Sequence, residues 1–358
     1  VSINELTNHT YIDHELSVNL DSTDAFEGPE KLLEIWFYPS RKTIPTQGGE
    51  KKTLRSISFE NWVQILKLVK CEVLSIKSTE KMDAFLLSES SMFVCDHKLT
   101  LKTCGTTTTL FCLEELFSLV QRELGWSYLN PKYDRIHPFK VFYSRRCFMF
   151  PLRQRSIHKN WCDEVEYLNK FFCLGKSYLV GRNDEGNHWN LYVTETNSEL
   201  GDLEGEDVQD EENDDDETLE ILMTGLDASK AQQFVTDRKP GVEIGEDHDN
   251  GHSLGLVTTQ QTKLDQVYDN NANFSFHHDA FAFTPCGYSS NLILDEEYYY
   301  TLHVTPEKGW SYASFESNVP VSAVSDGTQD NIDVMKRVLN VFQPAAFCLT
   351  FFAKDIMN

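Results

Sequence analysis

The sequence predicts an α+β fold built on antiparallel β-sheets. Short segments with alternating apolar and polar residues are typical of half-buried strands, and fewer, longer segments carry apolar residues three and four positions apart, as amphipathic helices do. The strand segments occur in clusters with helices between them, which favours antiparallel sheets over a doubly wound parallel fold. The segments follow a similar order in the two halves of the chain, which suggests an internal duplication.

In the first half of the chain, a strand is expected over residues 31–39 (KLLEIWFYP). Ser58 is a suitable N-cap for the helix that follows, because its hydroxyl can accept from a free backbone amide of the first turn. Further strands are expected over 71–78, 81–94, 96–105, 139–144 and 188–196. The apolar spacing predicts three helices, with core faces made by Trp62, Ile65, Leu66 and Val69, by Leu113, Leu116, Phe117, Val120 and Leu124, and by Trp161, Val165, Leu168 and Phe172.

The second half repeats this pattern between two acidic loops, expected at about 198–217 and 226–270. Residues 218–226 (TLEILMTGL) predict a strand or a short helix. Further strands are expected at 279–284, 297–305, 310–317 and 346–352, with a helix whose core face is Ile332, Met335, Leu339 and Phe342.

The charge of the chain narrows the choice of partners. Its formal net charge is −24, and the run 202–217 (DLEGEDVQDEENDDDE) contributes eleven acidic residues. Nucleic acids and anionic membranes are disfavoured as partners, because phosphate binding needs clustered Lys and Arg. A cationic ligand is compatible with this charge. No apolar run approaches the roughly 20 residues that span a bilayer.

The nine cysteines contain no C-x-x-C pair, so zinc-finger and thioredoxin-type functions have no support, and no metal site is expected. The N-terminal residues lack the apolar core of a signal peptide, so reduced thiols and a cytoplasmic location are expected.

Two motifs have a functional and a simpler explanation. Residues 251–255 (GHSLG) match the G-x-S-x-G nucleophile elbow, but the preceding residues are acidic and polar, and a Gly-rich loop is the better interpretation of Ser253. His277, His278 and Asp279 are metal-ligand types, but adjacent strand residues point to opposite faces. At most one of the two histidines can then share a face with a distant ligand, and the start of a strand explains the motif.

Other residues are candidates for catalysis. Cys104 precedes Gly105 at the step from a strand to a helix, where a helix N-terminus can favour the thiolate; a buried inert thiol is the alternative. Ser289 is expected in a turn, within residues 284–291. His303 and Glu307, four apart in an expected strand, should share a face, and a structural role is open for each.

Residues 86–94 (LLSESSMFV) interrupt an apolar strand with polar residues. A solvated hairpin turn is one explanation. Alternatively, a serine hydroxyl can attack the preceding carbonyl to form an ester, and a base can then drive β-elimination and chain cleavage. The resulting pyruvoyl group forms a Schiff base with an amine substrate and accepts the electron pair left by CO2. The chemistry leaves Ser90 and Ser91 equally eligible.

Six segments in a fixed order are more specific than any one motif. They are FEGPEKLLEIWF (26–37), LSESSMFV (87–94), LKTCGTT (101–107), FYSRR (142–146), TPCGYSSN (284–291) and LHVTPEKGWSYASFESN (302–318). Together they resemble the eukaryotic S-adenosylmethionine decarboxylase proenzyme family, close to its fungal branch.

This resemblance implies a pyruvoyl-dependent decarboxylase that supplies the aminopropyl donor for spermidine and spermine. It implies a single domain, 1–358, with a four-layer α/β/β/α sandwich of two antiparallel sheets. The zymogen would cut itself between Glu89 and Ser90 into a small chain, 1–89, and a large chain, 90–358. A homodimer is also implied. The alternative is a catalytically inactive relative that acts as a regulatory partner subunit.

Roles for individual residues follow only from the resemblance. Ser90 would become the pyruvoyl group, Cys104 would be the proton donor, and Ser289 and His303 would assist processing. Phe26 and Phe283 resemble the rings that stack on the adenine of S-adenosylmethionine. The other expected contributors are Glu307 at the ribose, Leu87 near the base, and the acidic residues Glu27, Glu30 (counted as catalytic) and Glu89.

Animal and fungal members of this family are often activated by putrescine, and the matching positions predict the same here. Leu32 stands where plant members, which do not need the diamine, carry Arg. The residues expected to bind putrescine are Glu34, Lys102, Phe142, Asp216, Thr218, Glu220, Glu316 and Phe352.

Overall fold

The computed structural model describes residues 28–46, 48–88, 90–148, 150–182, 187–200, 217–236, 250–269, 274–283, 286–325 and 327–353. They divide into two compact units, each described here by itself. The N-terminal unit lies within Asp24–Leu74 and Lys81–Asn213, and the C-terminal unit within Ser75–Glu80 and Asp214–Asn358. Phe26, Glu27, Glu89 and Asp216, four of the predicted site residues, lie outside the described residues.

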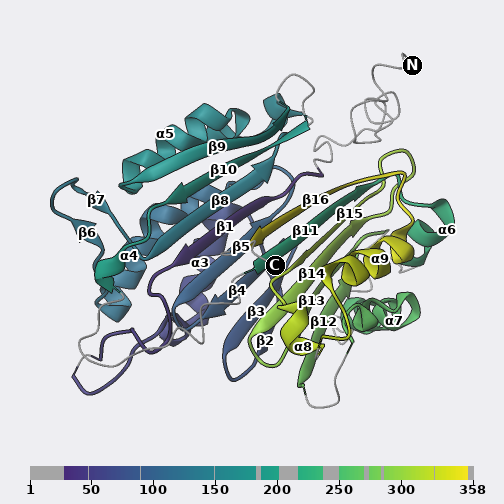
Figure 1. Cartoon of the computed structure of the whole chain (residues 1–358), viewed down its shortest axis with the longest axis horizontal. Coiled ribbons are helices and arrows are strands. Elements are labelled where there is room, and N and C mark those ends of the chain that lie inside the picture. The colour runs from purple at the N-terminus through teal and green to yellow at the C-terminus, as the bar shows by residue number, and fades with distance from the viewer. Residues whose placement is uncertain are drawn as a thin grey trace. The chain divides into compact units, whose positions relative to one another are not determined.

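The N-terminal unit is built on an eight-stranded sheet, apart from most of the edge strand β2 (Val73–Ser78), whose residues from Ser75 on are assigned to the C-terminal unit (Figure 1). Across the sheet the strands are β2 (Val73–Ser78), β3 (Met82–Leu87), β4 (Ser90–Cys95), β5 (Lys98–Thr103), β1 (Lys31–Trp36), β8 (Lys140–Arg146), β10 (Asn187–Thr194) and β9 (Gly175–Arg182). The neighbours from β3 to β9 pair antiparallel. A separate pair of short strands, β6 (Leu129–Asn130) and β7 (Arg135–Ile136), lies outside this sheet.

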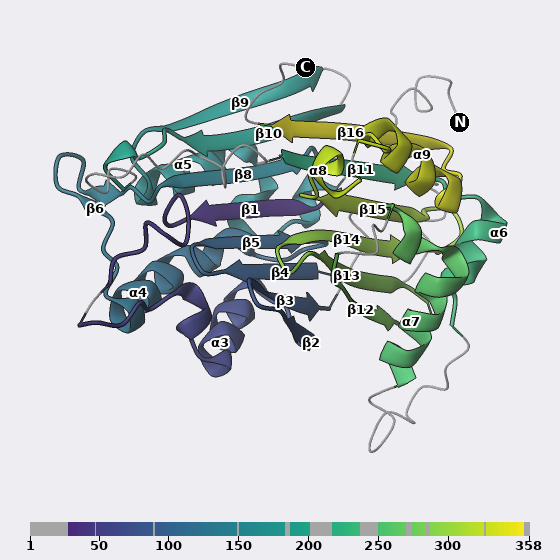
Figure 2. The same ribbon diagram turned by 60° about the horizontal axis from the view of Figure 1, so that its bottom comes forward.

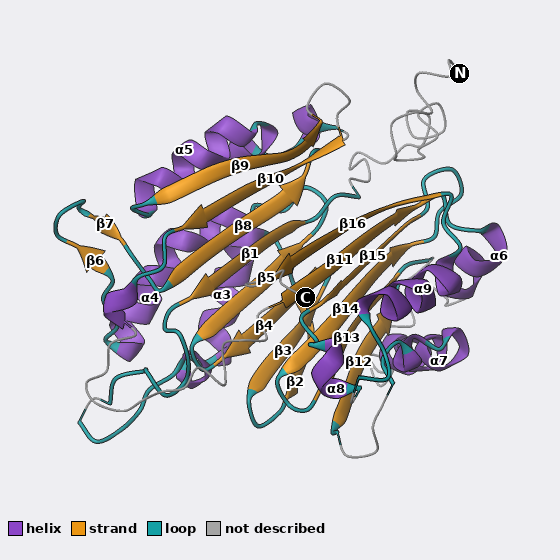
Figure 3. Ribbon diagram, viewed as in Figure 1, coloured by secondary structure: helices purple, strands orange, loops and turns teal. Residues whose placement is uncertain are grey.

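Helices α3 (Phe59–Val69), α4 (Leu113–Leu124) and α5 (Trp161–Phe171) belong to this unit (Figure 3). Ser58 caps α3 by accepting from the Asn61 amide, as predicted. The predicted apolar faces of α3 and α4 are buried in full and join strand residues such as Leu33, Ile35 and Leu101 in one hydrophobic core. The apolar spacing of the sequence therefore places these two helices correctly.

The C-terminal unit is built on a six-stranded antiparallel sheet (Figure 2). Across the sheet the strands are β12 (Phe276–Ala282), β13 (Tyr288–Leu294), β14 (Tyr298–Thr305), β15 (Tyr312–Ser317), β11 (Glu217–Thr224) and β16 (Ala346–Ala353). The helices are α6 (Ala228–Ala231), α7 (Asn250–Thr262), α8 (Val321–Val324) and α9 (Asn331–Phe342). Leu292, Leu302 and Phe315 form the core with buried residues of α9 such as Val334 and Val338.

The two sheets have the same strand connectivity over six strands. In the N-terminal unit the first strand, β1, lies between β5 and β8, after the run β2-β3-β4-β5; in the C-terminal unit β11 lies between β15 and β16, after the run β12-β13-β14-β15. Only β10 and β9 have no counterpart among the described residues. This shared topology confirms the predicted α+β fold with two antiparallel sheets and explains the similar order of elements in the two halves.

Several predicted elements are wrong in detail. Strand β13 is missing from the prediction because its first residues, Tyr288–Asn291, are mostly polar, so Ser289 lies in a strand and not in a turn. Strand β9 was also missed. In α9 the core face is Val334, Val338 and Phe342, whereas Ile332 is exposed. Of the predicted face, Phe342 is buried and Met335 and Leu339 pack partly buried against the core, so only Ile332 is wrong and Val334 and Val338 were missed.

The segment 226–270 is not the acidic loop that the sequence suggested. Its described residues contain α6 and α7, and Leu226, Phe234, Leu264 and Tyr268 are buried in the core of the C-terminal unit. The many polar and acidic residues in this range obscured the few apolar ones that pack.

The GHSLG motif lies inside α7 and is not a nucleophile elbow. Ser253 is exposed on the helix, and Gly255 lies against β12. A Cβ added at Gly255 would be 2.7 Å from the Ala280 carbonyl carbon and 2.7 Å from the Phe281 nitrogen. The glycine is therefore needed for close packing of helix on strand.

Replacing Gly255 by Ala should destabilise the C-terminal unit. The added methyl group meets backbone atoms that cannot rotate away, and overpacking of this kind costs about 1–3 kcal/mol, more than the ~1 kcal/mol that Ala gains over Gly in a helix. Chemical denaturation measures the effect, with Ser253→Ala as the control on the exposed side of α7. An unfolding free energy equal to that of the control would contradict the close packing.

Candidate active site

The predicted site residues that lie in strands of the C-terminal unit share one face of its sheet. Directly opposed residues of antiparallel strands point to the same side, and so do residues two apart along a strand. Register pairs Ser289 with His303, Thr301 with Glu316, and Glu316 with Glu220. The opposite face carries the core residues. Polar groups thus collect on the face that the helices of this unit do not cover.

Ser90 is the first residue of β4, directly after the hairpin turn that joins β3 to β4. Leu87 pairs with Ser90, and the described residue of the turn between them is Ser88. The Ser88 amide donates to the Glu72 carbonyl at 2.9 Å, which fixes the turn. Ser90 and Ser91 are both fully buried, but alternation points them to opposite faces of the sheet. The polar interruption in the sequence is therefore a tight turn followed by buried serines.

Cys104 distinguishes Ser90 from Ser91. It follows β5 directly, and its backbone N–H donates to Ser90 Oγ at 3.3 Å. Thr107 Oγ1 donates to the Cys104 carbonyl at 2.7 Å, and the side chain of Cys104 is half-buried. The 3₁₀ turn Thr109–Cys112 begins five residues later, so the predicted helix N-terminus is not at Cys104. Cys104 is therefore distinguished by the hydrogen bond from its amide to Ser90, and not by a helix N-terminus.

Ser289 and His303 form a hydrogen-bonded pair across β13 and β14. Ser289 Oγ lies 2.9 Å from His303 Nδ1, and both residues are buried. Thr301 Oγ1 donates to the Ser290 carbonyl at 2.9 Å and lies 3.4 Å from His303 Nε2. Because that hydroxyl proton points at a carbonyl, the oxygen is left to accept from Nε2–H. This arrangement favours a lone pair on Nδ1, facing Ser289.

The remaining residues expected near the substrate are found in both units. Leu87 is buried at the end of β3. Phe283 follows β12, with its ring 4.9 Å from that of Phe281. Strand β14 ends at Thr305, so Glu307 does not continue the strand face of His303 as predicted; it lies in the following turn, where the amide of Trp310 donates to its carbonyl. Its Oε2 is buried and has no hydrogen-bond partner among the described residues.

In the N-terminal unit, two buried carboxylates have lysine partners. Glu30 Oε2 lies 3.1 Å from Lys102 Nζ, and Glu34 Oε2 lies 3.0 Å from Lys98 Nζ. Trp36 Nε1 also donates to Glu34 at 2.7 Å. Lys98 and Trp36 were not predicted as partners of Glu34. Trp36 lies two residues after Glu34 on the same strand face, and Lys98 lies opposite Trp36 in β5, which was the available clue.

The strand register brings together residues that were predicted to bind the diamine. Phe142 lies opposite Glu34 in β8, and buried Leu32 lies opposite Lys102 in β5. All four side chains share one face of the eight-stranded sheet.

In the C-terminal unit two predicted diamine ligands oppose one another. Glu220 and Glu316 pair across β11 and β15, and both are buried, Glu316 completely. The hydroxyl of Tyr299 donates to Glu316 Oε1 at 3.0 Å. Thr218 pairs with Phe352 on the same face. Like charges directly opposed in a sheet repel, so this arrangement suits a cationic ligand.

The histidine-rich segment of β12 is structural. His277 Nε2 lies 3.0 Å from Glu296 Oε1, and burial lowers the pKa of His278 to about 4. Asp279 accepts from Ser75. No group of three or more His, Cys, Asp or Glu side chains among the described residues is arranged to hold a metal ion. All nine cysteines are free thiols.

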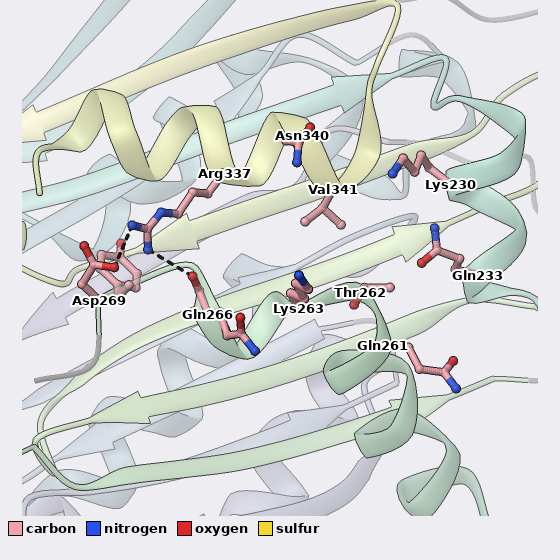
Figure 4. A pocket seen from close by; sticks show the side chains of 11 residues that line it. Lys230, Gln233, Gln261, Thr262, Lys263, Gln266, Asp269, Arg337, Asn340 and Val341 are labelled. Carbon is pink, nitrogen blue, oxygen red and sulfur yellow. Dashed lines mark hydrogen bonds and ion pairs between the residues drawn. The ribbon is translucent and has the colours of Figure 1, made fainter. Parts of the chain in front are cut away.

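A pocket of the C-terminal unit lies elsewhere, between α6, α7 and α9 (Figure 4). Its volume is about 680 Å³, and its lining includes Lys230, Lys263 and Arg337. Arg337 pairs with Asp269 at 2.7 Å. This pocket contains none of the predicted site residues. The candidate site is therefore located by the geometry of the strands and not by this pocket.

No helix in the described ranges is long and apolar enough to cross a bilayer.

Comparison with known proteins agrees with these features. A family model described as adenosylmethionine decarboxylase matches residues 23–358. The chain is 62% identical to the S-adenosylmethionine decarboxylase proenzyme of Saccharomyces cerevisiae, with 100% of this chain and 89% of the yeast protein covered. It is 35% identical to the proenzyme of Xenopus laevis, with 92% and 84% covered. It is 34% identical to proenzyme 4 of Arabidopsis thaliana, with 90% and 83% covered. The chain therefore belongs to the adenosylmethionine decarboxylase family, and its high identity to the yeast proenzyme agrees with the predicted fungal branch.

Proposed function

We propose that residues 1–358 act as one S-adenosylmethionine decarboxylase domain that matures by cutting itself between Glu89 and Ser90. Ser90 supplies the pyruvoyl group of the large chain, 90–358, and Glu89 becomes the C-terminus of the small chain, 1–89. The mature enzyme removes CO2 from S-adenosylmethionine to give the aminopropyl donor for spermidine and spermine. Catalysis by this chain, and not a regulatory role as an inactive relative, is supported by the presence of Ser90, Cys104, Ser289 and His303 together.

One observation carries the proposal. The Cys104 amide donates to Ser90 Oγ at 3.3 Å, although the two residues are 14 positions apart in the sequence. The residue that is expected to become the prosthetic group is therefore adjacent to the residue that is expected to donate a proton. The same amide holds the Ser90 hydroxyl in one place before the chain is cut.

The cleavage chemistry needs an attacking hydroxyl and a base. Ser90 Oγ attacks the Glu89 carbonyl carbon, the C–N bond breaks, and an ester and a free amine result. A base then removes the Ser90 Cα proton, and the Glu89 carboxylate leaves. The remaining dehydroalanine hydrolyses, with loss of ammonia. His303 is suited to the base role, because the contacts of Thr301 and Ser289 favour a lone pair on Nδ1.

The residues around Ser90 fit the group that replaces it. Ser90 is buried at the end of a strand beside a backbone N–H donor, so a carbonyl formed there would be held and shielded from water. A pyruvoyl group supplies a ketone that binds the substrate amine and accepts the electron pair left by CO2. The half-buried Cys104 thiol would return a proton to the substrate carbon. Phe283, with Phe26, would stack on the adenine, and the free Oε2 of Glu307 would accept from the ribose hydroxyls.

Intact-mass analysis tests the cleavage. We expect two chains of 89 and 358 − 89 = 269 residues, the larger without a free amino terminus. Ser90→Ala should abolish the cut because the attacking hydroxyl is lost. Ser91→Ala removes an equally buried neighbouring hydroxyl on the other face and should leave the cut in place. A single uncut chain would support the inactive regulatory relative, and a cut one residue later would refute Ser90.

Putrescine is the proposed activator. Glu220 and Glu316 present two opposed buried carboxylates, which a diammonium ion would neutralise, with Thr218 and Phe352 on the same face. Asp216, Glu34, Lys102 and Phe142 complete the expected set. Glu34 has Lys98 as a partner, and we assign the main charge for the diamine to the directly opposed pair Glu220 and Glu316.

Glu316→Gln should blunt activation by putrescine. Removing one of two opposed carboxylates takes away a direct partner of the ammonium, and the concentration for half-maximal activation should rise about tenfold or more, the equivalent of ~1.4 kcal/mol. Turnover measured against putrescine concentration tests this. Glu296→Gln, in the turn between β13 and β14, is the control and should respond like the parent. An unchanged response of Glu316→Gln would mean that the diamine binds elsewhere.

A homodimer in the cytoplasm is the proposed setting. Tyr178, Leu179 and Val180 are consecutive and exposed on β9, the edge strand of the eight-stranded sheet. An apolar edge of this kind favours pairing with another chain. Nine free thiols agree with a reducing compartment.

A further inference from the structure

The turn that follows Cys104 is held by two buried side chains distant in the sequence. Lys31 Nζ donates to the Gly105 carbonyl at 2.9 Å, and Gln154 Nε2 donates to the same oxygen at 3.3 Å. Lys31 Nζ also lies 3.4 Å from Gln154 Oε1. Both side chains are almost completely inaccessible to solvent. One carbonyl, next to the candidate proton donor, is therefore the meeting point of two donors.

A fully buried ammonium is costly unless its surroundings stabilise it. Among its neighbours, Lys31 has the Gly105 carbonyl, the Gln154 amide oxygen and the ring of Phe148, whose centroid is 5.0 Å from Nζ. Arg145 lies over the same ring at 4.3 Å. The Lys31 amine thus lies at a specific place, held by the Gly105 carbonyl, one residue from Cys104.

The segment that carries Gln154 is itself firmly attached. His158, four residues on, contacts Glu164 Oε1 of α5 at 2.6 Å through Nδ1. Glu164 also accepts from Tyr143 at 2.8 Å and from Arg145 at 2.7 Å, both in β8. Burial lowers the pKa of His158, so the neutral ring is the form that donates to Glu164. This network fixes the position from which Gln154 reaches Gly105.

The turn needs such support because its backbone is unusual. Gly105 has φ +55°, and no atom lies within 4 Å of an added Cβ, so the backbone conformation itself, and not space, requires glycine. Thr107 and the Cys104 amide provide only contacts to Cys104 itself. The carbonyl of Gly105 is the one point where β1 and the 151–159 segment both hold the turn.

We propose that Lys31 and Gln154 are positioning residues for Cys104: together they clamp the Gly105 carbonyl and keep an ammonium at the residue that directly follows the thiol. The clamp fixes where the thiol lies. The ammonium stabilises the negative charge that remains on sulfur when the S–H proton is given to the substrate carbon, until solvent returns a proton. This role rests on the proposed function of Cys104 as the proton donor.

The test uses the Ser90→Ala chain, which remains uncut, so that the state of Cys104 is measured without turnover. Alkylation of Cys104 by iodoacetamide is followed by peptide mass spectrometry at pH 7 and at pH 10. Lys31→Met should lower the rate at pH 7 about threefold or more, because the thiolate loses a stabilising charge. At pH 10, where the thiol is ionised in either chain, the rate should stay within about twofold. Lys31→Arg keeps the charge and should restore most of the pH 7 rate.

Gln154→Leu provides an independent measurement if Lys31→Met fails to fold. It removes one donor to Gly105 and one contact of Lys31 and should also slow the pH 7 reaction, though less. Gln329→Leu is the matched control: Gln329 is buried in the C-terminal unit and donates to the Val267 carbonyl at 2.9 Å. It should leave the rate at Cys104 unchanged.

If Lys31→Met and Gln154→Leu alkylate like the control at both pH values, the clamp is only structural and the proposal is wrong. If instead the parent chain, in which Ser90 is intact, does not cut itself, the proposed function is wrong. The alkylation rates can still be interpreted, because they are measured on the uncut Ser90→Ala chain.

Discussion

The antiparallel pairing of β4 with β5 is the constraint on which the candidate site depends. Ser91 pairs with Lys102, so Ser90 and Cys104 lie at the same end of the two strands, where the Cys104 amide reaches Ser90 Oγ. A slip of one residue would exchange the faces of Ser90 and Ser91 and remove this contact. Lys31 and Gln154 hold Gly105, the residue that follows Cys104, at this end of β5.

The internal duplication explains the two families of buried carboxylates. The sequence Leu33-Glu34-Ile35 of β1 and Leu219-Glu220-Ile221 of β11 occupies the same place in the shared strand order. Glu34 lies opposite Thr100 and pairs with Lys98, whereas Glu220 lies opposite a second carboxylate, Glu316. Glu34 thus has a lysine partner in one sheet, whereas Glu220 faces a second carboxylate in the other. The second arrangement is the one proposed above to bind the diamine.

The sequence predicted what depends on local patterns. Ser58 and the apolar faces of α3 and α4 were found because capping and helical spacing are local. Strand β13 was missed because its polar serines are buried by tertiary structure, and Gly255 was misjudged because its reason is contact with β12. Reaction chemistry alone made Ser90 and Ser91 equally suitable as the attacking residue, and the family resemblance selected Ser90. The β4–β5 register distinguishes the two serines physically, because it brings the Cys104 amide to Ser90 Oγ. The Lys31–Gln154 clamp joins residues 123 positions apart, which no local pattern reveals.

The central claim is that the thiol of Cys104 serves turnover and not cleavage, and comparing the two reactions in Cys104→Ala tests it most directly. The backbone amide that holds Ser90 Oγ survives this change, so cleavage should continue, while decarboxylation should fall about 10²-fold or more with the loss of the acid. Cys112→Ala is the control, because burial raises the pKa of that thiol to about 12 and leaves it inert. Equal loss of cleavage and turnover in Cys104→Ala, or turnover equal to that of the control, would contradict the account.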